Sequence, residues 1–363
     1  MPYFTNTPGP TSAGSTAATG ASGLGDITGD ITMASPPEDS ISDLEFSTKS
    51  DLLAVASWDK RVRIYDVSQT GLNSGRAIYA HGGPVLGVAW SDDGSKLVSG
   101  GTDNAARLWD VTTGQSTQVA AHDDPIRSVR WFTPPGANAQ MVVTGSWDKT
   151  IKYWDLRQQQ PVGSVNLLER VYTMDVSGDL LVIGTAENHI QVINLKNPGT
   201  IFQSRPSPLK WQTRVVACFP DASGFVVGSI EGRCAFVYLD AKNDALAFSF
   251  RCHRTARTGG SGTDVYAVNA VSFHPVHGTF STAGADGTFH FWDKDSKSRT
   301  KGFPPVGGTI SATGFNRNGS IFAYAVSYDW SKGHQYNTPT YPNKIMLHKV
   351  GDEEAKRKVA TRY

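Results

Sequence analysis

Hydrophobic and polar residues alternate in short runs along most of the chain, and one such run recurs at a nearly fixed interval. Its first copy occupies residues 57–67 (SWDKRVRIYDV), where Val62 and Ile64 point to the face opposite Tyr65. A two-residue period that follows a turn containing Asp is typical of a β-strand. Five more copies are visible, at residues 101–111, 146–156, 185–195, 229–239 and 284–294.

The spacing of these copies predicts the architecture. The turn acids are separated by 39 to 55 residues, and three of the five intervals are 44 or 45 residues. Each unit contains four strand-like runs, and several copies end in Trp-Asp or Tyr-Asp. A period of about 40 to 45 residues with such endings is the signature of WD-repeat β-propeller blades. The longest interval is explained by a glycine-rich insertion at residues 256–264, which we expect to be a loop.

A seventh unit follows the sixth copy, with strands expected near residues 310–315, 321–327 and 344–350. It lacks a fourth strand, whereas the isolated run Asp30 to Met33 needs a partner. Pairing the two closes the ring and removes the exposed sheet edges that invite aggregation. The prediction is an all-β, seven-bladed WD-repeat β-propeller with its seventh blade closed by the N-terminal strand. We expect a flexible Gly/Ser/Thr/Ala tail at 1–26, the propeller at 27–350 and a charged C-terminal tail at 351–363.

Composition narrows the classes of partner. The formal net charge is only +1, so no bulk charge points to duplex DNA or an anionic membrane. The three cysteines show no CxxC spacing, which fits a reducing compartment without a zinc site. No apolar run is long enough to span a membrane, and the N-terminus lacks the pattern of a secretory signal. We expect a nuclear or cytoplasmic protein without metal, cofactor, membrane partner or small-molecule substrate.

Histidine, hydroxyl and acidic residues recur together and imitate a catalytic triad. A nucleophile site would occur once, whereas this set returns with the repeat, so it indicates a structural network in which an acid orients a His that bonds a hydroxyl and an indole. An enzyme with chemistry in the channel would need a unique constellation of titratable groups, so no catalytic residue is predicted. The network residues are His81, Ser99, Asp103 and Trp109; His122, Thr144, Asp148 and Trp154; and Thr282, Asp286 and Trp292.

Two tryptophans are candidates for binding. Trp58 and Trp147 each precede a turn acid, where a small residue would serve equally well. The equivalent turns of all blades gather on one face, so both should share it with Glu231 and Arg233. Rigid aromatics beside charges are typical of interface hot spots, although each Trp could instead cover the edge of its own blade. Lys210 and Arg214, before the fifth blade, could pair with carboxylates of a partner segment.

Two basic clusters are candidates for binding single-stranded nucleic acid. Cations interleaved with aromatics can follow a phosphate backbone and stack bases, but a charged run often only faces water. His253 could equally be the structural His of the sixth blade. The first cluster contains Phe250, Arg251, His253, Arg254 and Arg257, and the second contains Lys294, Lys297, Arg299 and Lys301 after Trp292.

Beyond the general repeat, several motifs resemble the nucleoporin-associated mRNA export factors, a family of WD-repeat proteins that bind the GLEBS segment of an FG nucleoporin. The most specific are SPPEDSISDLEFS (35–47), TGSWDKTIKYWDLR (144–157), SPLKWQTR (207–214), GSIEGR (228–233), CHR (252–254), VNAVSFHPVHGT (268–279), FWDKD (291–295) and SYDWSKGH (327–334).

The resemblance implies a non-enzymatic adaptor for mRNA export at the nuclear pore, shuttling between nucleus and cytoplasm. It implies a helical, acidic GLEBS hairpin across the face that carries the two tryptophans, and contact with single-stranded RNA. The mitotic-checkpoint WD-repeat adaptors are close relatives that use a similar face for GLEBS segments of kinetochore proteins, and they stay the alternative. The resemblance places peptide contacts at Trp58, Trp147, Lys210, Arg214, Glu231 and Arg233, and RNA contacts at Phe250, Lys294, Lys297 and Arg299.

Overall fold

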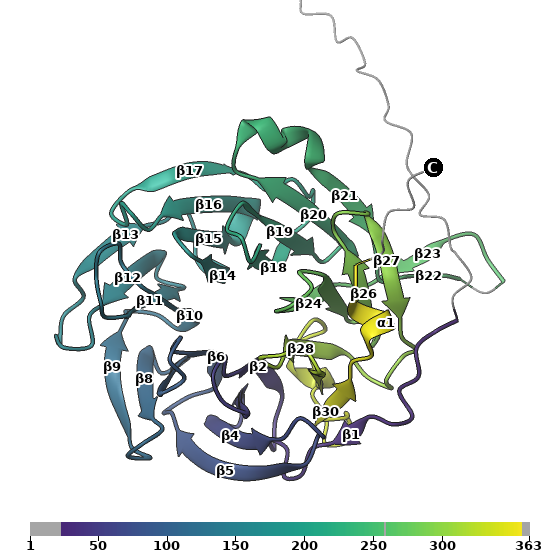
Figure 1. Cartoon of the computed structure of the whole chain (residues 1–363), viewed down its shortest axis with the longest axis horizontal. Helices are drawn as coiled ribbons and strands as arrows, with labels where there is room; N and C mark the ends of the chain where they lie inside the picture. Colours follow the sequence, from purple (N-terminus) through teal and green to yellow (C-terminus); the bar gives the residue numbers. More distant parts are fainter. Residues whose placement is uncertain (1–22, 258, 358–363) are drawn as a thin grey trace, which may run out of the picture.

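Seven four-stranded antiparallel sheets surround a central channel, so the predicted seven-bladed propeller is confirmed (Figure 1). The computed structural model describes residues 23–257 and 259–357. In each blade the first strand lines the channel and the fourth lies at the rim.

The first four blades follow one another directly along the chain. From the channel outward, their strands are β2 (Ile41–Phe46), β3 (Leu52–Ser57), β4 (Arg61–Val67) and β5 (Asn73–Ala80); β6 (Val85–Trp90), β7 (Lys96–Gly101), β8 (Ala105–Asp110) and β9 (Ser116–Ala121); β10 (Ile126–Phe132), β11 (Met141–Ser146), β12 (Thr150–Trp154) and β13 (Gly163–Asn166); and β14 (Val171–Ser177), β15 (Leu180–Thr185), β16 (His189–Asn194) and β17 (Ile201–Pro206).

The last three blades include the insertion and the ring closure. Their strands are β18 (Thr213–Cys218), β19 (Gly224–Ser229), β20 (Arg233–Tyr238) and β21 (Phe248–Arg251); β24 (Val268–Phe273), β25 (Phe280–Gly284), β26 (Phe289–Asp293) and β27 (Ser298–Gly302); and β28 (Ile310–Phe315), β29 (Ile321–Val326), β30 (Lys344–Lys349) and β1 (Ile31–Thr32). The short helical segments are η1 (Ala186–Asn188), η2 (Ala241–Leu246), η3 (His334–Tyr336) and α1 (Asp352–Ala355).

The up-and-down order of the strands gives the propeller two distinct faces. One end of the propeller carries the turns between the second and third strands and the links between blades, and we call it the upper face. The lower face carries the turns between first and second strands and between third and fourth strands. All repeat positions before a turn acid therefore lie on the upper face, and the position of a residue within its repeat decides its face.

The turn acid recurs because its carboxylate closes the upper turn. Asp59 Oδ1 accepts the backbone N–H of Arg61 at 3.0 Å, and Asp148 Oδ1 accepts that of Thr150 at 2.9 Å. The residue between, Lys60 or Lys149, adopts a left-handed φ of 69° or 66°. An Asx-type bond stabilises such a turn and compensates for the unfavourable φ.

Hydrophobic side chains fill the space between neighbouring blades, because both faces of every sheet are covered. Along β3, Leu53 and Val55 join the cluster shared with the seventh blade, whereas Leu52, Ala54 and Ala56 join the cluster shared with the second. Each interface between blades has such a cluster among the described residues. The two-residue period of a strand thus becomes an alternation between two interfaces.

The N-terminal strand closes the ring as expected. Strand β1 pairs antiparallel with β30, with Ile31 opposite Leu347, and the Met33 N–H donates to the Ile345 carbonyl at 2.9 Å. Below this pair, the buried His348 ring contacts Asp30 through Nδ1 at 2.7 Å and Glu354 of α1 through Nε2 at 3.1 Å. One imidazole therefore joins the strand that begins the propeller to the helix that follows its last strand.

This closure predicts a loss of stability in alkaline solution. Burial alone would lower the pKa of His348, but Asp30 and Glu354 outweigh burial and raise it to about 9. A raised pKa contributes stability that is full below about pH 6.5 and is lost as the pH rises through 9, by at most about 3 kcal/mol. Between about pH 6.5 and 9.5, the free energy of unfolding should therefore fall more steeply for the natural chain than for His348→Gln. Parallel curves in urea titrations would contradict this prediction.

The glycine-rich insertion differs from expectation, because part of it is a hairpin rather than a loop. Strands β22 (Arg254–Ala256) and β23 (Thr263–Val265) pair antiparallel and project beyond the rim of the sixth blade (Figure 1). Arg257 Nε and Asp264 Oδ1 form an ion pair of 2.7 Å next to these strands. The two strands are three residues long, too short for the alternation to be visible in the sequence.

The described chain contacts the propeller beyond both expected boundaries. At the start, the Gly25 N–H donates to the Gly302 carbonyl at 2.8 Å. At the end, α1 packs on β26 and β27, and Glu354 and Ala355 are buried. Most of the expected N-terminal tail, residues 1–22, and the last six residues lie outside the described part.

Candidate functional site

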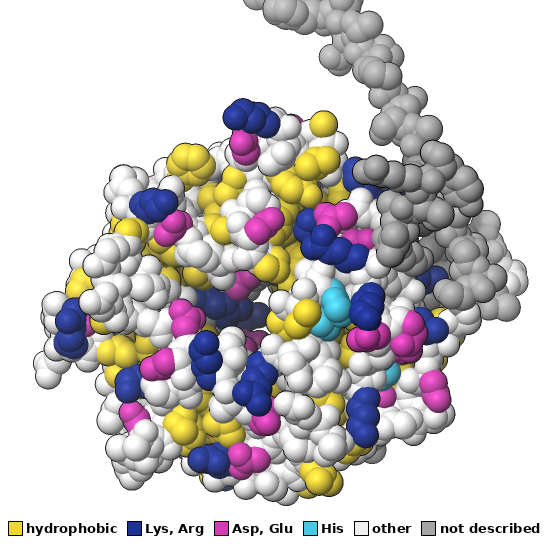
Figure 2. Space-filling view, in the orientation of Figure 1, with side chains coloured by type: hydrophobic (Ala, Val, Ile, Leu, Met, Phe, Trp, Pro, Cys, Tyr) yellow, Lys and Arg dark blue, Asp and Glu magenta, His cyan; other side chains and the backbone are white. Residues whose placement is uncertain are grey.

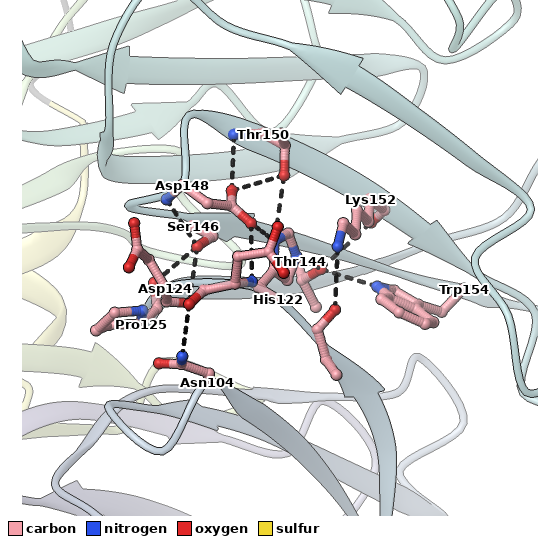
Figure 3. Close-up of polar contacts among 12 residues, drawn as sticks. Asn104, His122, Asp124, Pro125, Thr144, Ser146, Asp148, Thr150, Lys152 and Trp154 are labelled. Carbon is pink, nitrogen blue, oxygen red and sulfur yellow. Dashed lines mark hydrogen bonds and ion pairs between the residues drawn. The ribbon is translucent and has the colours of Figure 1, made fainter.

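The recurring His, hydroxyl and acid residues meet in three buried hydrogen-bond chains. In the third blade, His122 lies between Asp148, 2.7 Å from Nδ1, and Thr144, 2.7 Å from Nε2 (Figure 3). The Trp154 indole N–H donates to the same Thr144 hydroxyl oxygen at 2.8 Å. The chain thus ties the link that enters the third blade to its second and third strands.

Burial sets the direction of the pKa shift of His122, whereas hydrogen bonds set that of Asp148. Burial lowers the pKa of His122, although the Asp148 carboxylate opposes that effect. Burial would raise the pKa of Asp148, but hydrogen bonds from Thr150 and His122 outweigh it and lower the pKa. A neutral ring beside a carboxylate donates through Nδ1–H and accepts the Thr144 hydroxyl proton at Nε2.

The sixth blade repeats the chain with the same residue types. His253 bonds Asp286 at 2.9 Å and Thr282 at 3.0 Å, so it occupies the position of the structural His. The Trp292 indole N–H again donates to Thr282, at 2.9 Å.

In the second blade, a tyrosine hydroxyl replaces the tryptophan indole as a partner in the hydrogen-bond chain. His81 bonds Asp103 at 3.1 Å and Ser99 at 2.8 Å. Here the Tyr79 hydroxyl lies 2.8 Å from Ser99 Oγ, in the position that the indole occupies elsewhere, and the Trp109 ring packs edge-on against Trp90. The hydroxyls of Ser99, Thr144 and Thr282 belong to residues with no exposed surface, so no substrate can reach them.

The central channel contains the larger of the two cavities described, about 420 Å³. Seen along the ring axis, it is a hollow with Lys and Arg side chains at its base and carboxylates beside them (Figure 2). The lining residues that bear charge are Asp43, Glu45, Arg127, Arg130, Asp175, Arg214 and Asp329.

Aromatic side chains surround the upper mouth of the channel. The Trp58 ring stacks on Trp330, with centroids 4.0 Å apart, and Tyr328 lies 5.7 Å from Trp330. Trp147 lines the same cavity and keeps 36% of its surface exposed. The structure therefore brings the two predicted tryptophans to one rim. We call Trp58, Trp147, Tyr328 and Trp330 the aromatic rim.

Arg214 lines the same cavity as the aromatic rim and contacts the residue before Trp330. Its guanidinium donates to Asn269 Oδ1 at 3.2 Å and to the Asp329 carbonyl at 2.8 Å, and it forms no ion pair with any carboxylate in the described residues. These bonds orient the side chain but leave its charge uncompensated by a direct carboxylate contact. An arginine of this kind can form a charge-assisted hydrogen bond with a carboxylate of a binding partner.

The other predicted peptide contacts lie farther from the channel on the same face. Glu231 lies in the turn before β20 and Arg233 is the first residue of that strand; Glu231 Oε2 and Arg233 Nε are 3.6 Å apart. Lys210 is exposed and its ammonium lies 5.7 Å from the Trp211 ring. The three residues therefore extend the rim toward the fifth blade.

Several residues of this face were not predicted. Trp330 and Tyr328 come from the loop between β29 and β30, where no repeat position predicts them. Trp211, with 54% of its surface exposed, and Leu168, with 55%, add apolar area on the neighbouring blades. A tryptophan inside a long connection was the available signal for Trp330.

Charged residues inside the channel tie neighbouring blades together. The Arg130 Nε and Asp175 Oδ1 atoms are 3.0 Å apart, and the other Asp175 oxygen accepts the Cys218 N–H at 2.8 Å. Glu45 accepts the Trp90 N–H at 3.1 Å, and burial raises its pKa to about 7. These groups are occupied by backbone and ion-pair partners, which indicates a structural role. In the sequence, these residues could have been recognised as charged positions within the otherwise apolar first strand of a blade.

Three of the four predicted RNA residues, Lys294, Lys297 and Arg299, lie in or next to the turn between β26 and β27 and hence toward the lower face. The Lys294 ammonium lies 5.8 Å from the Phe219 ring and the Lys297 ammonium 4.8 Å from the Phe248 ring. Arg299 is exposed on the rim strand β27. Phe250 packs at 4.6 Å from Trp292 and is partly buried, so its ring mainly serves the core of the fifth and sixth blades.

The described part of the chain contains neither a metal cluster nor a membrane-spanning helix. Within residues 23–257 and 259–357, no group of three His, Cys, Asp or Glu side chains is arranged to hold a metal ion. No helix in these two ranges is long and apolar enough to cross a membrane.

The seven blades and their recurring turn acids define a WD-repeat β-propeller, and aromatic side chains line the mouth of its channel. The WD40 family (WD domain, G-beta repeat) matches residues 32–66, 73–110, 114–155 and 250–293. Similar proteins include mRNA export factor GLE2 of Chaetomium thermophilum, 57% identical over 94% of this chain and 96% of the relative. Poly(A)+ RNA export protein of Schizosaccharomyces pombe is 55% identical over 94% and 96%, and Protein Rae1 of Drosophila melanogaster is 45% identical over 89% and 95%. The chain belongs to the mRNA export factor family of WD-repeat proteins, and the expected non-enzymatic adaptor agrees with that family.

Proposed function

We propose that this protein is an mRNA export adaptor that binds an acidic, helical GLEBS segment of an FG nucleoporin on its upper face and single-stranded RNA near its lower face. The observation that carries the peptide proposal is an aromatic rim in the same cavity as Arg214, an arginine that pairs with no carboxylate of residues 23–257 and 259–357. Trp58 and Trp147 supply rigid apolar area, and Arg214 supplies a charge in the same cavity. Aromatic anchors around a desolvated charge are the usual centre of an interface.

The face favours a peptide over a small molecule for a reason of shape. Beyond the mouth, the same face carries the exposed Lys210 and Trp211 and the partly buried Glu231 and Arg233, so the candidate contacts extend over several blades. An amphipathic segment covers such a band with its apolar side and places carboxylates over the cations. Capture of a synthetic GLEBS peptide by the full chain tests this proposal, and the decisive variant opens the Discussion.

The names of the relatives support the cellular role. Two of them are named for export of mRNA or of poly(A)+ RNA, and their similarity covers nearly the whole chain. We therefore place the protein at the nuclear pore, moving between nucleus and cytoplasm. Co-purification of FG nucleoporins with the tagged full chain, rather than kinetochore proteins, is the expected result.

The RNA contact predicts a charge-dependent affinity. Lys294→Glu should weaken binding of a fluorescent oligouridine about tenfold or more and lower the salt dependence, because it replaces a phosphate-neutralising cation by an anion. The matched control is Lys196→Glu, whose lysine lies in the corresponding lower-face region of the fourth blade and pairs with Asp179 at 3.0 Å. Fluorescence anisotropy at several salt concentrations measures both. Equal loss for the two variants would contradict a local RNA surface.

A further inference from the structure

The segment after the last strand is fixed to the lower side of the sixth blade. We call residues 351–357 the C-terminal strap. The Thr279 hydroxyl donates to the Ala355 carbonyl at 2.7 Å, and Arg357 Nε donates to the His277 carbonyl at 2.7 Å. These two bonds hold the strap against the turn between β24 and β25.

These contacts place the Arg357 guanidinium next to the predicted RNA surface. Arg357 lies 2.8 Å from Asp295 Oδ2, and the other oxygen of this carboxylate lies 2.6 Å from the Lys294 ammonium. Asp295 is thus held between a cation of the blade and a cation of the strap. A second carboxylate, Asp221, is close enough to Lys294 for their charges to interact.

The Arg357 pair has little to do with stability. The two side chains keep 54% and 45% of their surface exposed, and an ion pair this exposed contributes at most about 1 kcal/mol to folding. Its larger effect is local, because without Arg357 the Asp295 carboxylate would pair with Lys294 alone and would cancel the charge of that lysine. Counted over Lys294, Asp295 and Asp221, the net charge is −1 without Arg357 and 0 with it, so the arginine removes a net negative charge next to Lys294.

We propose that Arg357 is a positioning residue for the RNA surface, which shares the Asp295 carboxylate with Lys294 and so leaves part of the Lys294 charge uncompensated for an RNA phosphate. The Lys294 side chain keeps 13% of its surface exposed for that contact. The C-terminal strap is then an electrostatic part of the binding surface rather than only an end of the chain. This inference rests on the proposed RNA contact. It assigns to the strap a ligand class, the phosphate backbone of single-stranded RNA.

The test uses the full chain and a fluorescent oligouridine in anisotropy titrations at several salt concentrations. Arg357→Ala should weaken binding about twofold to fivefold, the size expected of one exposed charge. The slope of log affinity against log salt should also become less steep. Asp295→Asn should strengthen binding, and the double variant should return to about the affinity of the natural chain.

The matched control is Lys356→Ala. Lys356 is the neighbouring cation of the strap but pairs with Asp352, away from Asp295. Its loss should change RNA affinity less than that of Arg357, and thermal unfolding of every variant checks the fold.

The outcomes separate this inference from the function on which it rests. If Lys294→Glu weakens binding but Arg357→Ala matches Lys356→Ala, the strap proposal is overturned and the RNA surface stands. If Arg357→Ala weakens binding and Asp295→Asn does not restore it, the action through Asp295 is overturned. If the natural chain does not bind the oligonucleotide, or Lys294→Glu has no effect, the proposed RNA function itself fails.

Discussion

Replacing Trp58 and Trp147 together by alanine should lower the affinity for a GLEBS peptide at least about a hundredfold, which would abolish its capture in a pull-down. Trp147 lines the channel mouth with 36% of its surface exposed, and Trp58 lines the same cavity and stacks on Trp330 with ring centroids 4.0 Å apart. Removing both leaves Arg214 in open water, where its attraction for a carboxylate is weak. Isothermal titration calorimetry with the purified full chain measures the change.

Phe202→Ala provides the matched control. Phe202 is also a large exposed aromatic, with 64% of its surface accessible, but it lies on the rim strand β17. Its loss should leave peptide affinity unchanged. Retained binding by the double tryptophan variant, with a normal melting temperature, would remove the upper face from consideration.

Asp148→Ala should lower the free energy of unfolding by about 2 to 4 kcal/mol. The carboxylate accepts bonds from His122 Nδ1, from the backbone N–H of Thr150 and from the Thr150 hydroxyl. Alanine leaves these donors without an acceptor inside the blade, and the His122 ring loses the group that orients it. Urea unfolding measures the change.

Asp123→Ala is the comparison within the same link. Asp123 is exposed, so its replacement should change the free energy of unfolding by less than about 0.5 kcal/mol. If the two variants unfold at the same urea concentration, the recurrent chain of hydrogen bonds is not the structural element that we describe.

The repeat made the fold predictable, because one strand pattern appeared often enough to count. Asp59 and its equivalents close the same turn in successive blades, so their spacing reported the blade number directly. The orphan run at Ile31 could be matched to the blade with a missing strand by topology alone. The hairpin β22–β23 was not predicted from the sequence, because its strands are too short to show a two-residue period.

The candidate site was less predictable, because some of its residues occupy a regular position of the repeat and others lie in connections outside it. Trp58 and Trp147 were visible as unusual residues at a regular position. Trp330 belongs to a connection outside the repeat, and it adopts a left-handed φ of 61° that places its ring against Trp58. Tyr79 shows the same limit, because it replaces an indole in the second blade from a different strand. Such substitutions depend on proximity in space, which a period along the chain does not encode.

The closure between Ile31 and Leu347 also has a consequence for the order of events during synthesis. The first strand of the described residues pairs with the last, so blades that pack through local contacts can form while the ring is still open. Until β28, β29 and β30 emerge, Met33 and the apolar side of the first blade lack the seventh blade that covers them. The nascent chain therefore exposes one unfinished interface for nearly the whole of translation, and this interface is where a chaperone would have most to protect.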